Sequence, residues 1–251
     1  MGYVMSIDTE TVSKTKAQTA GMIRCGMLPN CDTDSFTSGK FVFDIGWQIN
    51  DNEGNAIVSR NYLVAEVYNN RKFFPLCSYF YRNNLPFYEN AVANGNMYVL
   101  PLWIIKSIFV NDIKKYHIRK VWAYNASFDR DVLNNTMALV YHKAKSFTPN
   151  NVKWACIMRA ANQTFMKSRN YIKYTMGNGF ITKSGRPSTS AETAYRYIAK
   201  DNSFIESHTA LDDAQIEMII LQKALRYHKK METEPKRNSV YSDYYSYLKT
   251  L

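Results

Sequence analysis

The chain has no run of about 18 uninterrupted apolar residues, the length that a membrane-spanning helix needs. Its first residues also lack the basic segment followed by an apolar one that is typical of a secretory signal peptide. We therefore expect a cytoplasmic protein that does not act at a membrane. Internal repeats and long linkers are absent as well, so the 251 residues predict one α/β domain of ordinary size with insertions.

Cysteine is scarce, and Cys25, Cys31, Cys77 and Cys156 lack the close-paired spacing of a zinc site. Free thiols in a reducing compartment are the plainest interpretation, although Cys25 and Cys31 with other ligands remain an alternative metal site. Hydrophobic residues make up 46% of the chain, as in a folded globular protein.

Acidic residues are outnumbered by basic ones, 21 against 32, which leaves a formal net charge of +11. Such an excess favours a polyanionic partner. For any single basic cluster, an ordinary solvated surface is the alternative. The clusters are Lys167, Arg169 and Lys173; Lys183, Arg186 and Arg196; and Arg226, Lys229, Lys230, Lys236 and Arg237.

Acidic side chains nevertheless gather in three short segments. Asp8 and Glu10 follow the apolar run from Tyr3 to Ile7, which reads as a strand, so we expect both acids at the edge of a sheet. Residues two apart on a strand point to the same face, which lets these two carboxylates share one site. A polar turn after the strand is the alternative for this pair.

The other two segments each open an expected helix. Asn125 and Asp129 follow the apolar residues 121–124, and His208 precedes Asp213 by five positions. Asn125 and Asp129 could instead cap their helix, and His208 could pack or cap at the start of the last one. On that last helix the spacing from Asp213 to Ile216 and beyond places the acid near the apolar stripe, so we expect Asp213 to face inward.

Together these segments resemble the motifs of the DEDD exonucleases of the ribonuclease H-like superfamily, in the subclass with a catalytic histidine. That subclass includes polymerase proofreading exonucleases, ribonuclease T and oligoribonuclease. The first motif matches Asp8 and Glu10, the second matches Asn125, Phe128 and Asp129, and the third matches His208, Ala210 and Asp213. The basic composition and the insertions suggest a stand-alone nuclease of a phage or a low-GC bacterium.

The resemblance implies a site with two Mg²⁺ or Mn²⁺ ions, because such hard cations prefer carboxylate oxygens and two of them can clamp a phosphodiester during hydrolysis. It assigns the role of general base to His208, because a histidine with an ordinary pKa near 6.5 suits proton transfer. It makes Glu10 a catalytic residue as well as a metal ligand. Asp212 is distinguished from the ligand Asp213. The implied metal ligands are Asp8, Glu10, Asp129 and Asp213, and the implied substrate contacts are Thr9, Thr11, Asn125 and Phe128.

The expected activity is 3′→5′ removal of nucleoside monophosphates from single-stranded DNA. An exoribonuclease that trims RNA ends or short oligoribonucleotides is the alternative. An alternative from another class is a nucleic-acid-binding module that serves a polymerase or another replication partner. The oligomeric state is left open.

The resemblance also implies a mixed central sheet flanked by helices, with antiparallel strands first and parallel strands after them. Apolar and β-branched runs predict strands at 41–49 and 56–63, joined by a turn at 51–55, as two antiparallel neighbours of the first strand. Further strands are expected at 120–124 and 152–156. Helices are expected at 102–116, at about 127–141, and from the third motif through Tyr227.

Two insertions depart from the compact pattern within the predicted domain, residues 1–230. The first, about 14–39, could be a lid, a strand-binding loop or a partner site. The second, about 166–190, is basic and rich in turn residues. Residues 231–251 form a polar, Tyr-rich extension. Four aromatic residues could stack on bases, with packing as the alternative: Phe128, Tyr171, Tyr174 and Phe180.

Overall fold

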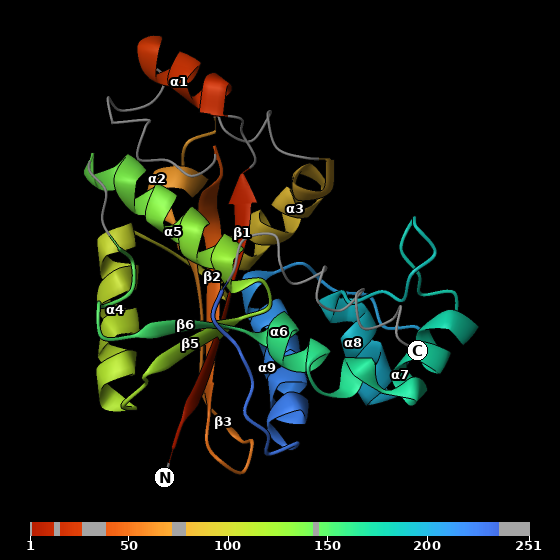
Figure 1. Ribbon diagram of the computed structural model, residues 1–251. Coiled ribbons are helices and arrows are strands. Elements are labelled where there is room, and N and C mark those ends of the chain that lie inside the picture. Colours follow the sequence, from red (N-terminus) through yellow and green to blue (C-terminus); the bar gives the residue numbers. More distant parts are fainter. Residues whose placement is uncertain (1, 13–15, 27–38, 72–78, 143–145, 236–251) are drawn as a thin grey trace.

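A six-stranded mixed sheet lies at the centre of the protein (Figure 1). The computed structural model describes residues 2–12, 16–26, 39–71, 79–142 and 146–235. The strand order is β4-β3-β2-β1-β5-β6. The antiparallel ladders join β1 to β2 and β2 to β3, whereas β4 runs parallel to β3, and β5 and β6 run parallel to β1. The predicted mixed α/β sheet is therefore confirmed. The strands are β1 Val4–Val12, β2 Phe41–Asn50, β3 Ala56–Val64, β4 Tyr98–Leu100, β5 Lys120–Ala123 and β6 Lys153–Cys156.

The predicted hairpin between β2 and β3 is present. One Asp51 carboxylate oxygen accepts hydrogen bonds from the backbone N–H groups of Glu53, Gly54 and Asn55, and Gly54 has a φ of 99°, which favours glycine. The expectation of two antiparallel neighbours for β1 is wrong, because β3 pairs with the far side of β2. The second neighbour of β1 is the parallel strand β5.

The helices predicted around the motifs are confirmed, with ends within two residues of those expected. α4 spans Leu102–Lys115, α5 spans Ala126–Tyr141 and α9 spans Ala210–Leu225. The segment before α4 contains elements that the sequence reading did not predict, including β4. The remaining helical segments are α1 Lys16–Arg24, α2 Ala65–Tyr68, α3 Tyr79–Ala93, α6 Ile157–Asn162, the 3₁₀ turn η3 Phe165–Lys167, α7 Arg169–Gly177 and α8 Ala191–Ala199.

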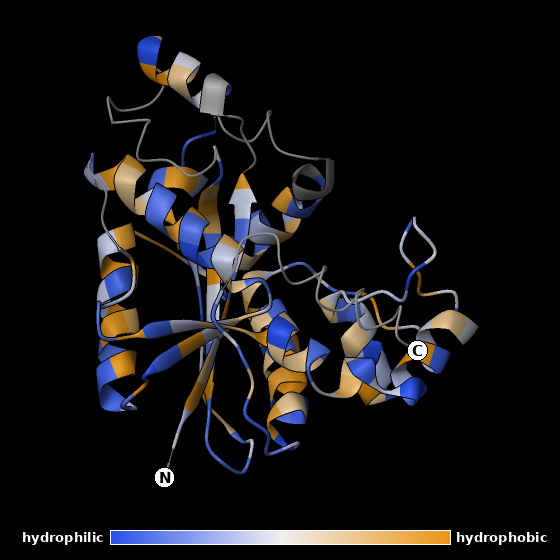
Figure 2. Cartoon of the chain, in the orientation of Figure 1, coloured by the Kyte–Doolittle hydropathy of each residue, from blue (hydrophilic) through white to orange (hydrophobic). Residues whose placement is uncertain are grey.

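Helices cover both faces of the sheet. α4 and α5 lie on one side in Figure 1, and α6 and α9 lie on the other. On the α4 side the indole of Trp47, fully buried on β2, packs edge-to-face on Phe109 with ring centroids 5.5 Å apart. Hydrophobic and hydrophilic segments alternate along α4 (Figure 2), as expected of a helix that buries one stripe against a sheet.

Both predicted insertions contain helices. α1 lies within the first one, and residues 14–15 and 27–38 of that insertion lie outside the described residues, so its role as a lid, a strand-binding loop or a partner site stays a prediction. The second insertion folds as η3, α7 and a turn closed by a bridge between Ile181 and Pro187. Tyr171 is fully buried and packs against Phe165 and Tyr197, so packing, not base stacking, accounts for that residue.

The start of the C-terminal extension lies against β6. The backbone N–H of Cys156 donates to the carbonyl oxygen of Thr233 at 2.7 Å, and Arg159 forms an ion pair with Glu232 at 3.2 Å. The tyrosines of the extension lie outside the described residues, as do Cys31 and Cys77, while Cys25 and Cys156 are free thiols. The domain boundary at about residue 230 stays a prediction.

None of the helices that the structure describes is long and apolar enough to cross a membrane.

Candidate active site

The first two acids lie inside β1, because the strand continues to Val12. The expectation that Asp8 and Glu10 emerge where the strand ends is therefore wrong. A gap between β1 and β5 nevertheless begins beside Asp8. The ladder between these two strands contains only two residue pairs, and the last of them joins Ser6 to Trp122. β5 ends at Ala123, and the later part of β1 runs on beyond it. The sheet thus parts beside Asp8, in the region where open α/β folds bind ligands.

α5 begins directly beyond β5 and brings the second motif to this opening. Asp129 lies in the first turn of α5 with 2% of its surface exposed, and the Thr9 hydroxyl donates to its Oδ1 at 2.9 Å. Asn125 occupies the position before the helix, but its side chain does not cap the helix. Instead its Oδ1 accepts a hydrogen bond from the Ser127 hydroxyl at 3.2 Å.

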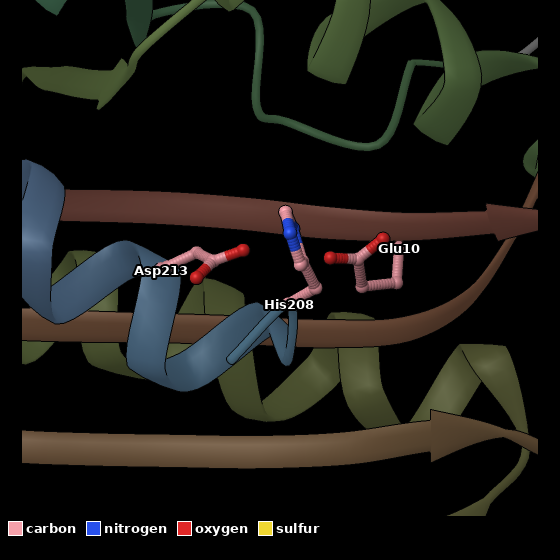
Figure 3. A group of neighbouring side chains, drawn as sticks. All are labelled: Glu10, His208 and Asp213. Carbon is pink, nitrogen blue, oxygen red and sulfur yellow. The ribbon is translucent and has the colours of Figure 1, made fainter. Parts of the chain in front are cut away.

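The third motif arrives on α9, which packs on the β1 and β2 strands. Asp213 lies in the first turn of α9 and is 6% exposed, so its predicted inward orientation is confirmed. His208 lies just before the helix, with a φ of 56°. Figure 3 shows His208 between Glu10 on β1 and Asp213 on α9. One ligand atom from each of the three residues lies within 4.8 Å of the other two.

Asp212 differs from its neighbour in surroundings. It is exposed, and one of its oxygens accepts hydrogen bonds from the hydroxyls of Ser207 and Thr209, each at 2.8 Å. This network holds the turn before α9 and leaves Asp213 as the acid that faces β1.

These segments enclose a cleft of about 330 Å³, here called the acidic cleft. Of the predicted substrate contacts, Thr9, Asn125 and Phe128 line it, whereas Thr11 is buried and does not. Two further acids, Glu206 and Glu217, belong to the lining, and the sequence reading missed both. The lining residues are Asp8, Thr9, Glu10, Tyr124, Asn125, Phe128, Asp129, Met158, Ser190, Ala191, Glu206, Asp213 and Glu217.

Glu217 could have been predicted as a site residue from the sequence. It follows Asp213 by four positions and therefore shares its face of α9. It is 3% exposed, and one of its oxygens accepts a hydrogen bond from the Tyr124 backbone N–H at 3.1 Å. Glu217 thus connects α9 to the end of β5. Glu206 lies in an irregular segment, and its approach to the cleft depends on the path of the chain after α8.

Burial dominates the electrostatics of the acidic cleft. Desolvation raises the pKa of Asp129 to about 7 and, together with nearby acids, that of Asp213 to about 8. The pKa values of Asp8 and Glu217 are raised well above their ordinary range, first by burial and then by neighbouring carboxylates. Within the described part of the chain, no ion pair with lysine or arginine reaches these four acids.

The histidine has the opposite shift. Burial lowers the pKa of His208, which favours the neutral imidazole at neutral pH. Its Nδ1 lies 3.9 Å from an oxygen of Glu206, and burial raises the pKa of that carboxyl to about 7. The histidine therefore retains a nitrogen lone pair that can take a proton.

The donor set fits divalent cations that prefer oxygen. Carboxylates from two strand positions and two helix starts converge on the acidic cleft, and His208 adds one nitrogen. Among the described residues, Asp213 Oδ1 is buried and accepts no hydrogen bond, which is the state expected of an oxygen that a cation would satisfy.

The fold is similar to that of a full-length 3′-exonuclease known from a crystal structure. The two chains are 12% identical and align over 92% of this chain with a TM-score of 0.57. The chain spans 62% of the length of that exonuclease. The likeness shows a shared fold, which agrees with the mixed α/β sheet that the sequence predicts.

Two structures of E. coli exonuclease I also align, a zinc-bound complex with single-stranded DNA and a complex with a 5cy-dT13 oligonucleotide. Each is 12% identical and aligns over all of this chain and 43% of the other, with TM-scores of 0.47 and 0.43. No protein-family model matches the chain, and no curated protein matches it in sequence.

Proposed function

We propose that this protein is a metal-dependent 3′→5′ exonuclease that releases nucleoside monophosphates from single-stranded nucleic acid, with DNA as the first candidate substrate. The observation that carries the proposal is the convergence of Asp8, Glu10, Asp129 and Asp213 on one cleft, with a ring nitrogen of His208 within 4.8 Å of carboxylate oxygens of Glu10 and Asp213. These residues come from three distant parts of the chain, and none of the ion pairs with lysine or arginine in the described part of the chain reaches Asp8, Asp129 or Asp213. The fold shared with a 3′-exonuclease supports the direction of digestion.

Asp8, Glu10, Asp129 and Asp213 would hold two Mg²⁺ or Mn²⁺ ions. When bound, such ions stabilise the charge that develops on the attacking and leaving oxygens of a phosphodiester. The pKa of Asp8 is raised first by burial and then by Glu217, Asp129, Glu10 and Asp213, so Asp8 interacts with each of the other three proposed ligands. It is our candidate for the ligand that both ions share.

His208 would act as the general base. Its lowered pKa favours the neutral imidazole at neutral pH, so it can accept the proton of the attacking water. One of its ring nitrogens lies within 4.8 Å of a carboxylate oxygen of Glu10 and one of Asp213, which supports a proton transfer beside the proposed metal ligands. Glu10 lies on the side of His208 away from Asp213 in Figure 3, and it would help to orient the attacking water.

Several features of the acidic cleft suit one terminal nucleotide. Its volume lies at the low end of the range for small-ligand sites. Phe128 offers a half-buried ring, with Lys40 Nζ 4.9 Å from the ring centroid. α5 and α8 both begin at the cleft, after Asn125 and Ser190, and helix N-termini favour phosphate groups. The net charge of +11 attracts the rest of the strand.

The test is digestion of 5′-labelled single-stranded DNA and RNA of matched sequence with Mg²⁺, Mn²⁺ or EDTA. The variants are Asp213→Asn and Asp212→Asn, the same change at adjacent positions of one helix. We expect a ladder that shortens from the 3′ end only with metal. Asp213→Asn should abolish it, while Asp212→Asn should retain most of the rate, because an asparagine oxygen can still accept from Ser207 and Thr209.

Faster digestion of RNA would replace DNA with an exoribonuclease assignment. Shortening from the 5′ end would overturn the direction. No cleavage of either strand with either metal would overturn the nuclease and favour a nucleic-acid-binding module, for which recovery of a polymerase from cells would be the next measurement.

A further inference from the structure

The turn before α9 needs external support. His208 has a left-handed backbone with a φ of 56°, which is uncommon for a residue with a side chain and persists only where neighbours fix it. The Thr209 side chain, next along the chain, does not cap the helix. The first N–H groups of a helix have no partner within the helix, so those of α9 need acceptors from elsewhere.

Asp44 on β2 supplies one of these acceptors. Its Oδ2 accepts a hydrogen bond from the Ala210 backbone N–H at 3.0 Å, across 166 positions of sequence. Asp44 lies opposite Glu10 in the ladder between β1 and β2, so it shares the sheet face that carries the site. It does not line the acidic cleft.

The Asp44 side chain is itself held from two further sides. Tyr88 on α3 donates its hydroxyl to Oδ2 at 2.9 Å, and the Asn61 amide on β3 donates to Oδ1. The same Tyr88 hydroxyl lies 3.4 Å from the carbonyl oxygen of His208. Asp44 is fully buried, and burial raises its pKa to about 6, while these hydrogen bonds lower it. A buried carboxylate with three donors is fixed in orientation.

Strands β1 and β2 also contact the start of α9. A Cβ at Gly46, two residues from Asp44, would lie 2.3 Å from the Leu211 backbone nitrogen, so the helix start contacts the strand backbone directly. On β1 the Ser6 hydroxyl donates to the Ala214 carbonyl oxygen at 2.7 Å. The start of α9 is thus held at three points by two strands.

We propose that Asp44 is a positioning residue, which holds the Ala210 N–H and thereby fixes the turn that presents His208 to Glu10 and Asp213. The inference deepens the proposed function and rests on it for its kinetic consequence. Tyr88 and Asn61 complete the arrangement by holding the Asp44 carboxylate. Without this anchor the imidazole shifts, and misplacement of a reacting group by about 1 Å can cost about 100-fold in rate.

The test compares Asp44→Ala with Asp112→Ala. Asp112 is a matched control, because it is another buried carboxylate that accepts hydrogen bonds, from Trp47 and Arg60, but it lies on α4, on the other side of the sheet. Both variants lose buried hydrogen bonds, so both are expected to be less stable. Only Asp44→Ala should lower kcat on single-stranded DNA, by about 10- to 100-fold, with KM within about threefold, because substrate binding is left intact.

A second measurement does not depend on activity. The chain has four histidines, and the imidazole NMR signal of His208 can be assigned by its loss in His208→Gln. Asp44→Ala should shift this signal and its titration midpoint and leave those of the other three histidines unchanged. Asp112→Ala should shift none of the four. Asp44→Asn, which keeps an oxygen for Ala210 N–H, should restore most of the kcat and the wild-type signal.

An unchanged kcat together with an unmoved His208 signal in folded Asp44→Ala would overturn the proposal. If that variant does not fold, Tyr88→Phe replaces it, and the same two results would be decisive. A wild-type protein without nuclease activity whose His208 signal still shifts in Asp44→Ala would refute the proposed function and leave the positioning role intact.

Discussion

Asp112 and the acidic cleft both place carboxylates in the interior of the protein, and their surroundings differ. Asp112 on α4 is 6% exposed and meets the Trp47 indole at 3.0 Å and the Arg60 guanidinium at 3.4 Å. In the acidic cleft, Asp8 and Asp213 are also largely buried, yet the charged neighbours that raise the pKa of each are other acids. Asp112 has a cationic partner, whereas no ion pair with lysine or arginine in the described part of the chain reaches Asp8 or Asp213.

The difference separates a structural carboxylate from a functional one. A buried acid that is paired and hydrogen-bonded costs little or stabilises, whereas a group of unpaired acids raises the free energy of the native state. A fold that keeps the costly arrangement is expected to gain from it when a ligand binds. In this protein that ligand is the proposed pair of divalent cations.

The largest effects on activity and stability should come from removing one carboxylate from each of the two sites, Asp8 from the acidic cleft and Asp112 from α4. Asp8→Asn removes one like charge and one metal ligand, so we expect activity to fall by at least about 1,000-fold, a loss of about 4 kcal/mol in transition-state stabilisation. The free energy of unfolding in EDTA should rise, because a neutral amide relieves repulsion. Asp112→Asn should do the reverse, with kcat unchanged and a loss of about 1–3 kcal/mol in stability.

Single-turnover rates and thermal unfolding in EDTA measure the two quantities for both variants. A drop in stability for Asp8→Asn would contradict the comparison, since it would show that the acid holds the fold together.

A substitution of His208 distinguishes a general base from a metal ligand at that position. His208→Gln should lower kcat by about 100- to 10,000-fold, the range for loss of a general base. The rise in melting temperature on adding Mn²⁺ should persist, because the four carboxylates remain. His228→Gln, at an exposed histidine that also has a positive φ, is the control and should leave both unchanged. Loss of the Mn²⁺ effect in His208→Gln would make the histidine a ligand.

The sequence predicts the sheet well because its strands are long apolar runs and its hairpin has a clear turn. It predicts the convergence of the three motifs through their resemblance to a family and not through periodicity. The end of β1 was misplaced because Asp8 and Glu10 read as polar residues that stop a strand. In fact strand pairing with β2 continues through both of them, and a neighbouring strand can override such local signals.

Contacts between segments that are far apart in the chain could not be predicted from the sequence. Asp44 reads as one polar residue in an apolar strand, and nothing in its neighbourhood predicts a bond to Ala210. Glu206 likewise reaches the cleft only through the path of the chain between α8 and α9. Burial of Tyr171 depends on Tyr197, which comes from the next helix. Each of these required the tertiary arrangement, whereas Glu217 could have been found from helix spacing alone.

The pH dependence of stability should distinguish the acidic cleft from an ordinary surface. In the metal-free native state the pKa values of Asp129 and Asp213 are about 7 and about 8, against 3.8 for an ordinary aspartate. Between about pH 4 and pH 8 the folded chain therefore binds more protons than the unfolded chain, so stability falls as pH rises. Thermal unfolding in EDTA at pH 5, 6, 7 and 8 measures the slope.

Saturating Mg²⁺ or Mn²⁺ should flatten that slope, because a cation stabilises the ionised acids that the native fold otherwise penalises. Asp112→Asn should keep the wild-type slope. A metal-free protein that becomes more stable toward pH 8 would contradict the assignment of these acids as unpaired.

The smallest effect should come from exposed charges, which neither site buries. Lys183 and Arg186 lie on the turn between α7 and α8, and the segment after this turn reaches the cleft at Ser190. We expect Lys183→Gln with Arg186→Gln to raise KM for single-stranded DNA about two- to fivefold with kcat unchanged, because phosphate contacts at a distance add binding without chemistry. The slope of log KM against log salt should fall by about 0.7 per lost contact. Lys114→Gln with Lys115→Gln, at the exposed end of α4, removes the same number of charges and should change neither quantity. Equal effects of the two changes would mean that only net charge attracts the strand, and a loss of kcat would place the turn within the chemistry of the acidic cleft.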